Sequence, residues 1–339
     1  MGLSIPLYPQ NLTDLFLSNA VELIVSIVAL VHGEVIVVKT SLIGSILSNL
    51  LLVLGMSFFF GGLQRTEQFF NKTAATTAAS LLVLSIASVI IPTAFEQFTN
   101  TTNVPIAELS RGTAVMLLLA YGCYLFFQLK THSAIYAQVG KKVAPRPRKH
   151  SIPEGAVSKA LAAAGAIGAA QGRTHSLEDD RLQHDELFQR DAYEKHAAAR
   201  KVEAIKPQLY IWVAVFTLAA STTLVALCAE FLIDSISAIT SGNNGISVEF
   251  VGLILLPIVG NAAEHATAVT VACKDKMDLA IGVAVGSSMQ VALLVIPFSV
   301  ILGWILGNDA MNLSFDGFLV AVLFVSVLLV NYLISDGKR

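Results

Sequence analysis

Charged residues are scarce in this sequence of 339 residues: Asp, Glu, Lys and Arg together account for 14%, whereas 55% of the residues are hydrophobic. The mean hydropathy of +0.69 is higher than that of soluble domains. A soluble globular protein is therefore excluded. The composition predicts an all-α, polytopic membrane protein that is surrounded mainly by lipid.

Further absences narrow the function. Only three cysteines are present, Cys123, Cys228 and Cys273; they lie in apolar segments without CxxC spacing and are interpreted as small buried hydrophobic residues. No basic patch with interleaved aromatic residues is present, so no nucleic-acid partner is expected. An HExxH motif and a serine-nucleophile setting are also missing, so an intramembrane hydrolase is disfavoured. Neither enzyme activity nor a cofactor is predicted.

Eight segments of roughly 20 or more residues are long enough to cross a bilayer. They are 12–31, 35–60, 74–95, 105–130, 208–239, 246–273, 278–307 and 313–334. Two groups of four follow from this spacing, namely a first transmembrane repeat at 12–130 and a second at 208–334. Between them lies a polar linker, 131–207, with a charged helix predicted at about 177–204.

The distribution of Lys and Arg predicts on which side of the membrane the linker lies. Of the 22 Lys and Arg residues, 14 fall between Lys130 and Lys206. If the eight segments alternate in direction, the basic residues of the short loops lie on the same side, with Lys39 as the one clear exception. Because short cytosolic loops carry an excess of Lys and Arg, the linker is predicted to be cytosolic.

Residues 19–55 recur without gaps, 242 positions later, as residues 261–297. Matching pairs include Asn19 and Asn261, Glu22 and Glu264, Gly44 and Gly286, and Ser45 and Ser287. Most matches are small or polar, so chance similarity between two apolar helices does not explain them. The first helices of the two copies are five segments apart, so they enter the membrane from opposite sides. This inverted repeat is typical of secondary transporters and places both glutamates near the bilayer midplane.

Two glutamates inside apolar segments predict a functional site. An ionised glutamate in hydrocarbon costs about 3 kcal/mol or more, so Glu22 and Glu264 are expected to be paired, protonated or functional. Residues three apart share one helical face, and each repeat presents two such polar pairs from adjacent helices. The predicted cation- and proton-binding residues are Asn19, Glu22, Ser45, Ser48, Asn261, Glu264, Ser287 and Gln290.

These side chains offer oxygen ligands, which suit a hard cation such as Ca²⁺, whereas Zn²⁺ prefers His or Cys. The two carboxylates balance the two charges of one Ca²⁺ ion. When the ion leaves, the carboxylates repel each other in a low dielectric and favour protons. Metal and protons therefore compete for one site, which is the physical basis of antiport. Ca²⁺ and H⁺ are predicted to be the transported substrates.

Other titratable residues have structural or functional interpretations. His265, directly after Glu264, is a candidate proton relay, although a histidine that only packs is an equal alternative. Glu230 and Asp234 could funnel cations or form a local hydrogen-bonded pair. Glu108 and Arg111 are three residues apart and are interpreted as an ion pair on one helix.

At these residues the chain resembles the cation/proton exchanger family of the Ca²⁺/cation antiporter superfamily, and most of all fungal vacuolar Ca²⁺/H⁺ exchangers. The similar blocks are SNAVELIVSIVAL, TSLIGSILSNLLLVLGMSFFFGG, ELSRGTAVMLLLAYGCYLFFQLKTH and GNAAEHATAVTVACKDKMDLAIGVAVGSSMQVALL. They lie within residues 12–133 and 208–338. The resemblance implies an inverted-repeat cation exchanger fold, a vacuolar membrane location, and Glu22 and Glu264 as the cation and proton carriers.

Three functional hypotheses follow. The first is an antiporter that exchanges cytosolic Ca²⁺ for protons from an acidic compartment by alternating access. The second is a Na⁺-driven Ca²⁺ exchanger, which would be expected to carry additional acids in its binding helices. The third is a non-transporting homologue that acts as a partner or regulator. The resemblance implies eleven helices, of which the chain lacks the first two, part of the third and the last. We therefore expect that the chain alone does not transport. A homo-oligomer is left open.

Overall fold

The computed structural model describes residues 19–98, 106–136, 140, 142, 211–240 and 246–338. Within these residues all regular secondary structure is helical, apart from an isolated β-bridge between Phe69 and Lys338. The chain divides into two compact units, Met1–Arg146 with Ala220–Arg339, and Pro147–Ala219. Only residues 211–219 of the second unit are described, so the helix predicted at about 177–204 lies outside the described residues.

The helices up to Tyr136 include those of the first predicted repeat and, in α7, the start of the predicted linker. They are α2 (Ala20–Val31), α3 (Val35–Leu47), η1 (Ser48–Val53), α4 (Leu54–Gln64), α5 (Lys72–Phe98), α6 (Ile106–Phe126), η2 (Phe127–Thr131) and α7 (Ser133–Tyr136). The segments named η are π-helical turns. Because α3, η1 and α4 follow one another without a break, they form one continuous span, Val35–Leu63.

The helices after the linker belong to the second predicted repeat. They are α10 (Ile211–Thr240), α11 (Val248–Phe250), η3 (Val251–Leu255), α12 (Leu256–Gly260), α13 (Ala262–Cys273), α14 (Met277–Ile281), η4 (Gly282–Gly286), α15 (Ser287–Gln290), η5 (Val291–Val295), α16 (Ile296–Ile305) and α17 (Gly317–Ile334). The segments from α14 to α16 form a single span, Met277–Ile305, whereas Val248–Gly260 and Ala262–Cys273 are bent by 50° relative to each other.

The number of spans agrees with the sequence prediction. Among the described residues, six helices are long and apolar enough to cross a membrane, or seven if the bent pair counts as one span. Together with the shorter apolar helix α2 they correspond to the eight predicted segments, and the predicted all-α membrane fold is confirmed. The domain boundaries at 130 and 208 stay a prediction.

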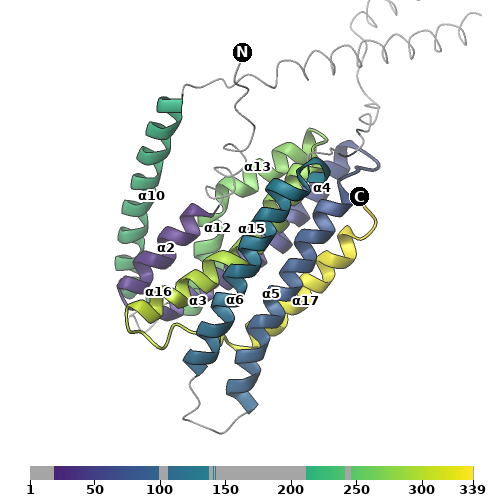
Figure 1. The fold of residues 1–339 in the computed structure, drawn as a ribbon. Coiled ribbons are helices and arrows are strands. Elements are labelled where there is room, and N and C mark those ends of the chain that lie inside the picture. Colours follow the sequence, from purple (N-terminus) through teal and green to yellow (C-terminus); the bar gives the residue numbers. More distant parts are fainter. Residues whose placement is uncertain are drawn as a thin grey trace, which may run out of the picture. The chain divides into compact units, whose positions relative to one another are not determined.

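Burial shows which helices lie at the centre of the bundle. In the most apolar window of Met277–Ile305, 72% of the residues are buried, and the value for Val35–Leu63 is 56%. In the window of Ala219–Thr240 only 18% are buried, as expected for a helix whose apolar side chains face lipid. The two central spans are repeat-equivalent. Figure 1 shows the surrounding helices, with α17 packed beside α5.

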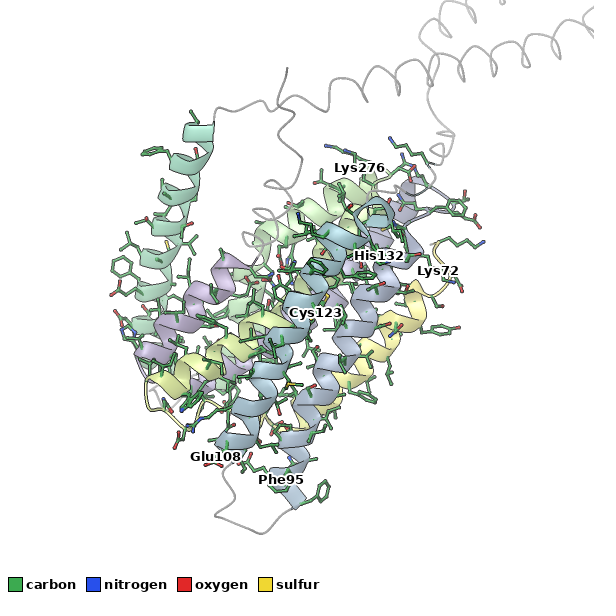
Figure 2. All side chains as sticks on the ribbon, in the orientation of Figure 1. Lys72, Phe95, Glu108, Cys123, His132 and Lys276 are labelled. Atoms are coloured by element: carbon green, nitrogen blue, oxygen red, sulfur yellow. The ribbon has the colours of Figure 1, made fainter. Side chains whose placement is uncertain are left out.

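The bundle has two ends with different side chains. Figure 2 shows Lys72, His132 and Lys276 at one end and Phe95 and Glu108 at the opposite end. We call the first end, which contains loops 65–71 and 274–276, the linker-side face, because η2 ends there at Thr131. The opposite end, which contains loops 32–34 and 306–316, is the far face. The lysines of the short loops lie on the linker-side face, as alternation of the segments predicts.

Two sequence interpretations were wrong. Cys123 in α6 and Cys228 in α10 are exposed, Cys228 at the edge of a cavity, and Cys273 is half-buried. The reason is that in a membrane protein apolar segments can face lipid or a cavity instead of a protein core. All three are free thiols. Arg111 makes its ion pair with Asp309, at 2.5 Å between Nη2 and Oδ1, and not on its own helix.

Candidate functional site

Each repeat has a helix that begins at an asparagine. Asn19 precedes α2 with φ −114° and ψ 16°, and Asn261 precedes α13 with φ −90° and ψ 10°. Neither residue has helical backbone angles, yet both carbonyls accept the first helical hydrogen bond, from Leu23 N at 3.0 Å and from His265 N at 2.9 Å. The two asparagine side chains therefore project from the ends of helices inside the apolar part of the bundle, where both are buried.

Each glutamate is bonded to the serine of its own repeat. The Ser45 hydroxyl donates to Glu22 Oε1 at 3.1 Å, and the Ser287 hydroxyl lies 3.0 Å from Glu264 Oε1. Both serines come from the central spans, Ser45 from α3 and Ser287 from α15. The two bonds are related by the 242-residue offset of the repeat, so the side-chain geometry has the same internal symmetry as the sequence.

The same serines also join the two repeats. Asn261 Nδ2 donates to Ser45 Oγ at 3.1 Å, and Ser287 Oγ lies 3.0 Å from Asn19 Oδ1. The side chain of Asn19 also donates to Gln290 Oε1. Because each serine contacts the glutamate of its own repeat and the asparagine of the other, the residues of both repeats form one polar layer.

Two polar residues depart from this symmetry. Ser48, the repeat mate of Gln290, has its hydroxyl 3.2 Å from His265 Nε2 and thereby connects that histidine to the layer. Asn49 donates to Ser287 Oγ at 3.3 Å and is fully buried. Sequence reasoning missed Asn49 because its repeat mate is Val291. The available signal was the cost of placing an amide in an apolar helix.

Both glutamates keep one oxygen without a hydrogen-bond partner. Glu22 Oε2 and Glu264 Oε2 are buried and unpartnered, and Asn49 Oδ1 is in the same condition. A buried carboxylate oxygen without a donor is costly unless a proton or a cation compensates it. The two orphaned oxygens stand at repeat-equivalent positions. They are therefore available for the cation and protons that the sequence predicts.

The donor set fits a hard divalent cation. Two carboxylates, amide oxygens of Asn and Gln, and serine hydroxyls are the oxygen ligands that Ca²⁺ accepts at variable geometry. Among the described residues no cluster of three or more His, Cys, Asp and Glu side chains exists that could hold a metal. Each residue's role in transport stays a prediction.

A cavity reaches this layer. It has a volume of about 540 Å³ and is bounded by Glu22, Ser45 and Asn261 at its polar end. Its remaining walls are mostly apolar side chains of α2, α3, α10 and α12, among them Leu224, Leu232, Leu256 and Val259. Val25, Ser41 and Pro257 line the cavity about one turn from Glu22, Ser45 and Asn261, in the direction of the far-face ends of their helices.

A close helix contact positions the first serine. A Cβ atom at Gly44 would collide with the backbone oxygen of Leu253 and with Cγ of Pro257, so only glycine permits the present approach of α3 to η3 and α12. This contact brings Ser45, the next residue, against Asn261. At Gly286, the repeat mate of Gly44, a Cβ atom would have nothing within 4 Å.

Comparison with known proteins agrees with this geometry. A sequence family described as "Sodium/calcium exchanger protein" matches residues 16–130 and 213–338. The chain is 40% identical to the "Vacuolar calcium ion transporter" of Cryptococcus neoformans over 97% of its own length and 59% of that protein. It is 39% identical to the protein of the same name from Schizosaccharomyces pombe, over 94% of the chain and 64% of that protein. The chain thus spans about 60% of these fungal relatives.

Two further relatives extend the comparison. The "Ca(2+)/H(+) antiporter" of Synechocystis sp. is 38% identical over 94% of the chain and 74% of that protein. Among solved structures, native YfkE is similar with a TM-score of 0.67 and 29% identity, covering 96% of the chain and 76% of YfkE. A second structure of that protein is described as a Ca²⁺/H⁺ antiporter. By its family match and these relatives, the chain belongs to the sodium/calcium exchanger protein family.

Proposed function

We propose that this protein is a secondary antiporter, not an enzyme, that exchanges cytosolic Ca²⁺ for protons across the vacuolar membrane. One observation carries the proposal: Glu22 and Glu264 occupy repeat-equivalent positions, each held through one oxygen by a serine, while the other oxygen is buried without a partner. A pair of such carboxylates can be compensated either by one divalent cation or by protons, and not by both at once.

The exchange follows from this alternative. With Ca²⁺ bound, the two carboxylates balance its charge and neutral oxygens of asparagine, serine and glutamine complete its ligand shell. Without Ca²⁺, two bare carboxylates in a low dielectric are unfavourable, so protons replace the ion. An empty, doubly charged site is the state of highest energy. Because crossing in that state is unfavourable, cation movement in one direction is coupled to proton movement in the other.

The serines can serve both states. A serine hydroxyl is a donor and an acceptor, so it donates to an ionised carboxylate and accepts from a protonated one. In this structure the Ser45 hydroxyl donates to Glu22 and accepts from Asn261 Nδ2. Each glutamate can therefore stay hydrogen-bonded to its serine when it binds a proton and when it releases it. His265, bonded to Ser48, is a candidate for carrying protons between the site and the linker-side face.

The comparisons support the substrate and the location. The fungal relatives are named as vacuolar calcium ion transporters, and the cyanobacterial relative is named as a Ca²⁺/H⁺ antiporter. A Na⁺-driven Ca²⁺ exchanger is the second candidate, since the family description names sodium and calcium. The absence of a third acidic ligand among the described residues favours protons over a monovalent metal ion as the counter-ion.

Uptake of ⁴⁵Ca²⁺ into acid-loaded vesicles tests the proposal. The measurement compares the 339-residue chain with an extended version in which it is fused to the flanking segments of a longer fungal relative. We expect uptake driven by a pH gradient in the extended version, no uptake driven by a Na⁺ gradient, and loss of uptake in Glu22→Gln and Glu264→Gln. Glu67→Gln, which changes an exposed acid paired with Lys338, is the control. Uptake driven only by Na⁺ would support the second candidate.

A further inference from the structure

The turn after α13 contains a backbone conformation that is unusual for its residue. Asp275 has φ +57°, and among the described residues it is the only non-glycine residue with a positive φ. Its repeat mate is Gly33, which has φ +80° and lies in the corresponding turn after α2. An L-residue in this region is disfavoured, although Asp and Asn tolerate it better than others. An aspartate at a position that suits glycine indicates that contacts of its side chain compensate for the unfavourable backbone conformation.

That side chain forms a buried ion pair. The Arg65 guanidinium, just after α4, lies 3.5 Å from Asp275 Oδ1 through Nε, and the two side chains are 9% and 4% exposed. The buried amide of Gln68 donates to the same carboxylate oxygen at 3.3 Å. Breaking a buried pair from one side leaves an uncompensated charge and is strongly unfavourable. The pair is therefore a strong local constraint.

Arg65 and Gln68 also hold the end of α13. Arg65 Nη1 donates to the carbonyl oxygen of Cys273 at 2.8 Å, and Gln68 Nε2 donates to that of Ala272 at 2.8 Å. These are carbonyls at the C-terminal end of α13, where a cation and side-chain donors are favourable. Two residues of the loop that follows the first central span, Arg65 and Gln68, thus cap the C-terminal end of α13. The N-terminal end of the same helix carries Glu264.

The corresponding turn at the far face is built differently. A Cβ atom at Gly33 would have nothing within 4 Å, so no side chain occupies the position equivalent to that of Asp275. The cavity at the polar layer extends from Glu22, which is one of its lining residues, about one turn toward the far face, where Val25, Ser41 and Pro257 line it. In this structure the constraint thus acts on the linker-side face and the cavity lies on the other side of the site.

We propose that Arg65 and Asp275 are positioning residues that hold α13, and with it Glu264, in the conformation closed to the linker-side face, and that this clamp opens when the site becomes accessible from that face. The clamp itself follows from the contacts above. Its part in transport rests on the proposed function.

Cys273 offers a direct measure of clamp opening. Its carbonyl is the acceptor of Arg65, and its half-buried thiol donates to Phe60 O in α4 at 3.8 Å. With Cys123 and Cys228 changed to serine, the rate at which a membrane-impermeant maleimide labels Cys273 reports how often α13 separates from α4. The measurement needs no transport.

Two substitutions remove the ion pair without forbidding the turn. Asp275→Asn keeps an amide that tolerates positive φ, and Asp275→Gly removes the side chain altogether. We expect both to raise the labelling rate about tenfold, the factor that corresponds to losing one charged hydrogen bond. The double variant Arg65→Gln with Asp275→Asn also loses the hydrogen bond from Arg65 to the Cys273 carbonyl, so it should be labelled at least as fast as Asp275→Asn alone. Glu67→Gln, which removes an exposed ion pair on the same face, should leave the rate unchanged.

Transport kinetics separate positioning from general destabilisation. In the extended version, Asp275→Asn should lower both the half-saturating Ca²⁺ concentration on the linker side and the maximal rate, since the site is then exposed to that side more often. Loss of folded protein would lower the maximal rate alone. Labelling within twofold of the parent in both Asp275→Asn and Asp275→Gly overturns the clamp. Absence of Ca²⁺ uptake in the extended version without substitutions would instead count against the proposed function. The labelling rates would still test the clamp, because they do not depend on transport.

Discussion

Gly44 and Gly286 provide a matched pair for testing how the site is assembled. The two residues are equivalent in the repeat and both lie in central spans, but their surroundings differ. A methyl group at Gly44 meets Leu253 O and the Pro257 ring, neither of which can rotate away, whereas at Gly286 it meets nothing within 4 Å. We therefore expect Gly44→Ala to destabilise the protein and Gly286→Ala to be tolerated.

The magnitude follows from two opposing terms. Replacing a helical glycine by alanine contributes about 1 kcal/mol of stability through helix propensity, and this term applies to both positions. Overpacking costs about 1–3 kcal/mol and applies only to Gly44. The propensity term cancels in the comparison, so Gly44→Ala should be less stable than Gly286→Ala by about 1–3 kcal/mol.

Reversible unfolding in detergent micelles with increasing SDS measures this difference, and Ca²⁺ binding by the same variants provides a second readout. Because the clash pushes α3 away from η3 and α12, Ser45 should lose its contact with Asn261, and Ca²⁺ affinity should fall only in Gly44→Ala. Equal stability of the two alanine variants would refute the argument, since the close approach would then not depend on the missing Cβ.

Three further predictions concern the ligands and the topology. Ser45→Ala and Ser287→Ala should each raise the half-saturating Ca²⁺ concentration by about fivefold, which corresponds to roughly 1 kcal/mol, with little change in maximal flux. The control is Ser299→Ala, because the buried Ser299 hydroxyl donates to a backbone carbonyl outside the site. Unchanged affinity in both site variants would place the ligand shell elsewhere. Asn49→Val, which introduces the residue of the repeat mate, should weaken Ca²⁺ binding while the protein still folds; wild-type affinity would exclude Asn49 from the site. A protease added to sealed vacuoles should cut within 131–206, and protection of this segment with cleavage at the far-face loops would reverse the predicted topology.

The sequence predicted the centre of the site because the polar residues there are costly. Glu22, Glu264 and their serines stand out in apolar segments, and repetition after 242 residues separates them from accidental polar positions. The structure brings these four residues together in two equivalent hydrogen bonds. Length and hydropathy also sufficed to predict the eight segments, since apolar segments of this length have few alternatives to crossing a membrane.

Partners from distant parts of the chain could not be predicted in the same way. Arg111 has an acidic residue three positions away on its own helix, yet it pairs with Asp309, which only the packing of α16 against α6 brings near. Asn49 was missed because the repeat does not preserve it, and the Asp275 turn was missed because backbone angles are not visible in composition. In each case the decisive term is the neighbour across an interface, which local spacing does not specify.

Proton release on Ca²⁺ binding tests the central claim most directly. Ca²⁺ is added to purified protein in weakly buffered detergent solution at a pH below neutrality, and a pH indicator records the protons released. If protons and Ca²⁺ compensate the same two carboxylates, addition of Ca²⁺ should release protons, and Ca²⁺ affinity should rise with pH. Glu22→Gln and Glu264→Gln should each reduce the release and weaken binding, whereas Glu67→Gln should behave like the parent. Ca²⁺ binding without proton release, or release that survives in both glutamine variants, would contradict the account.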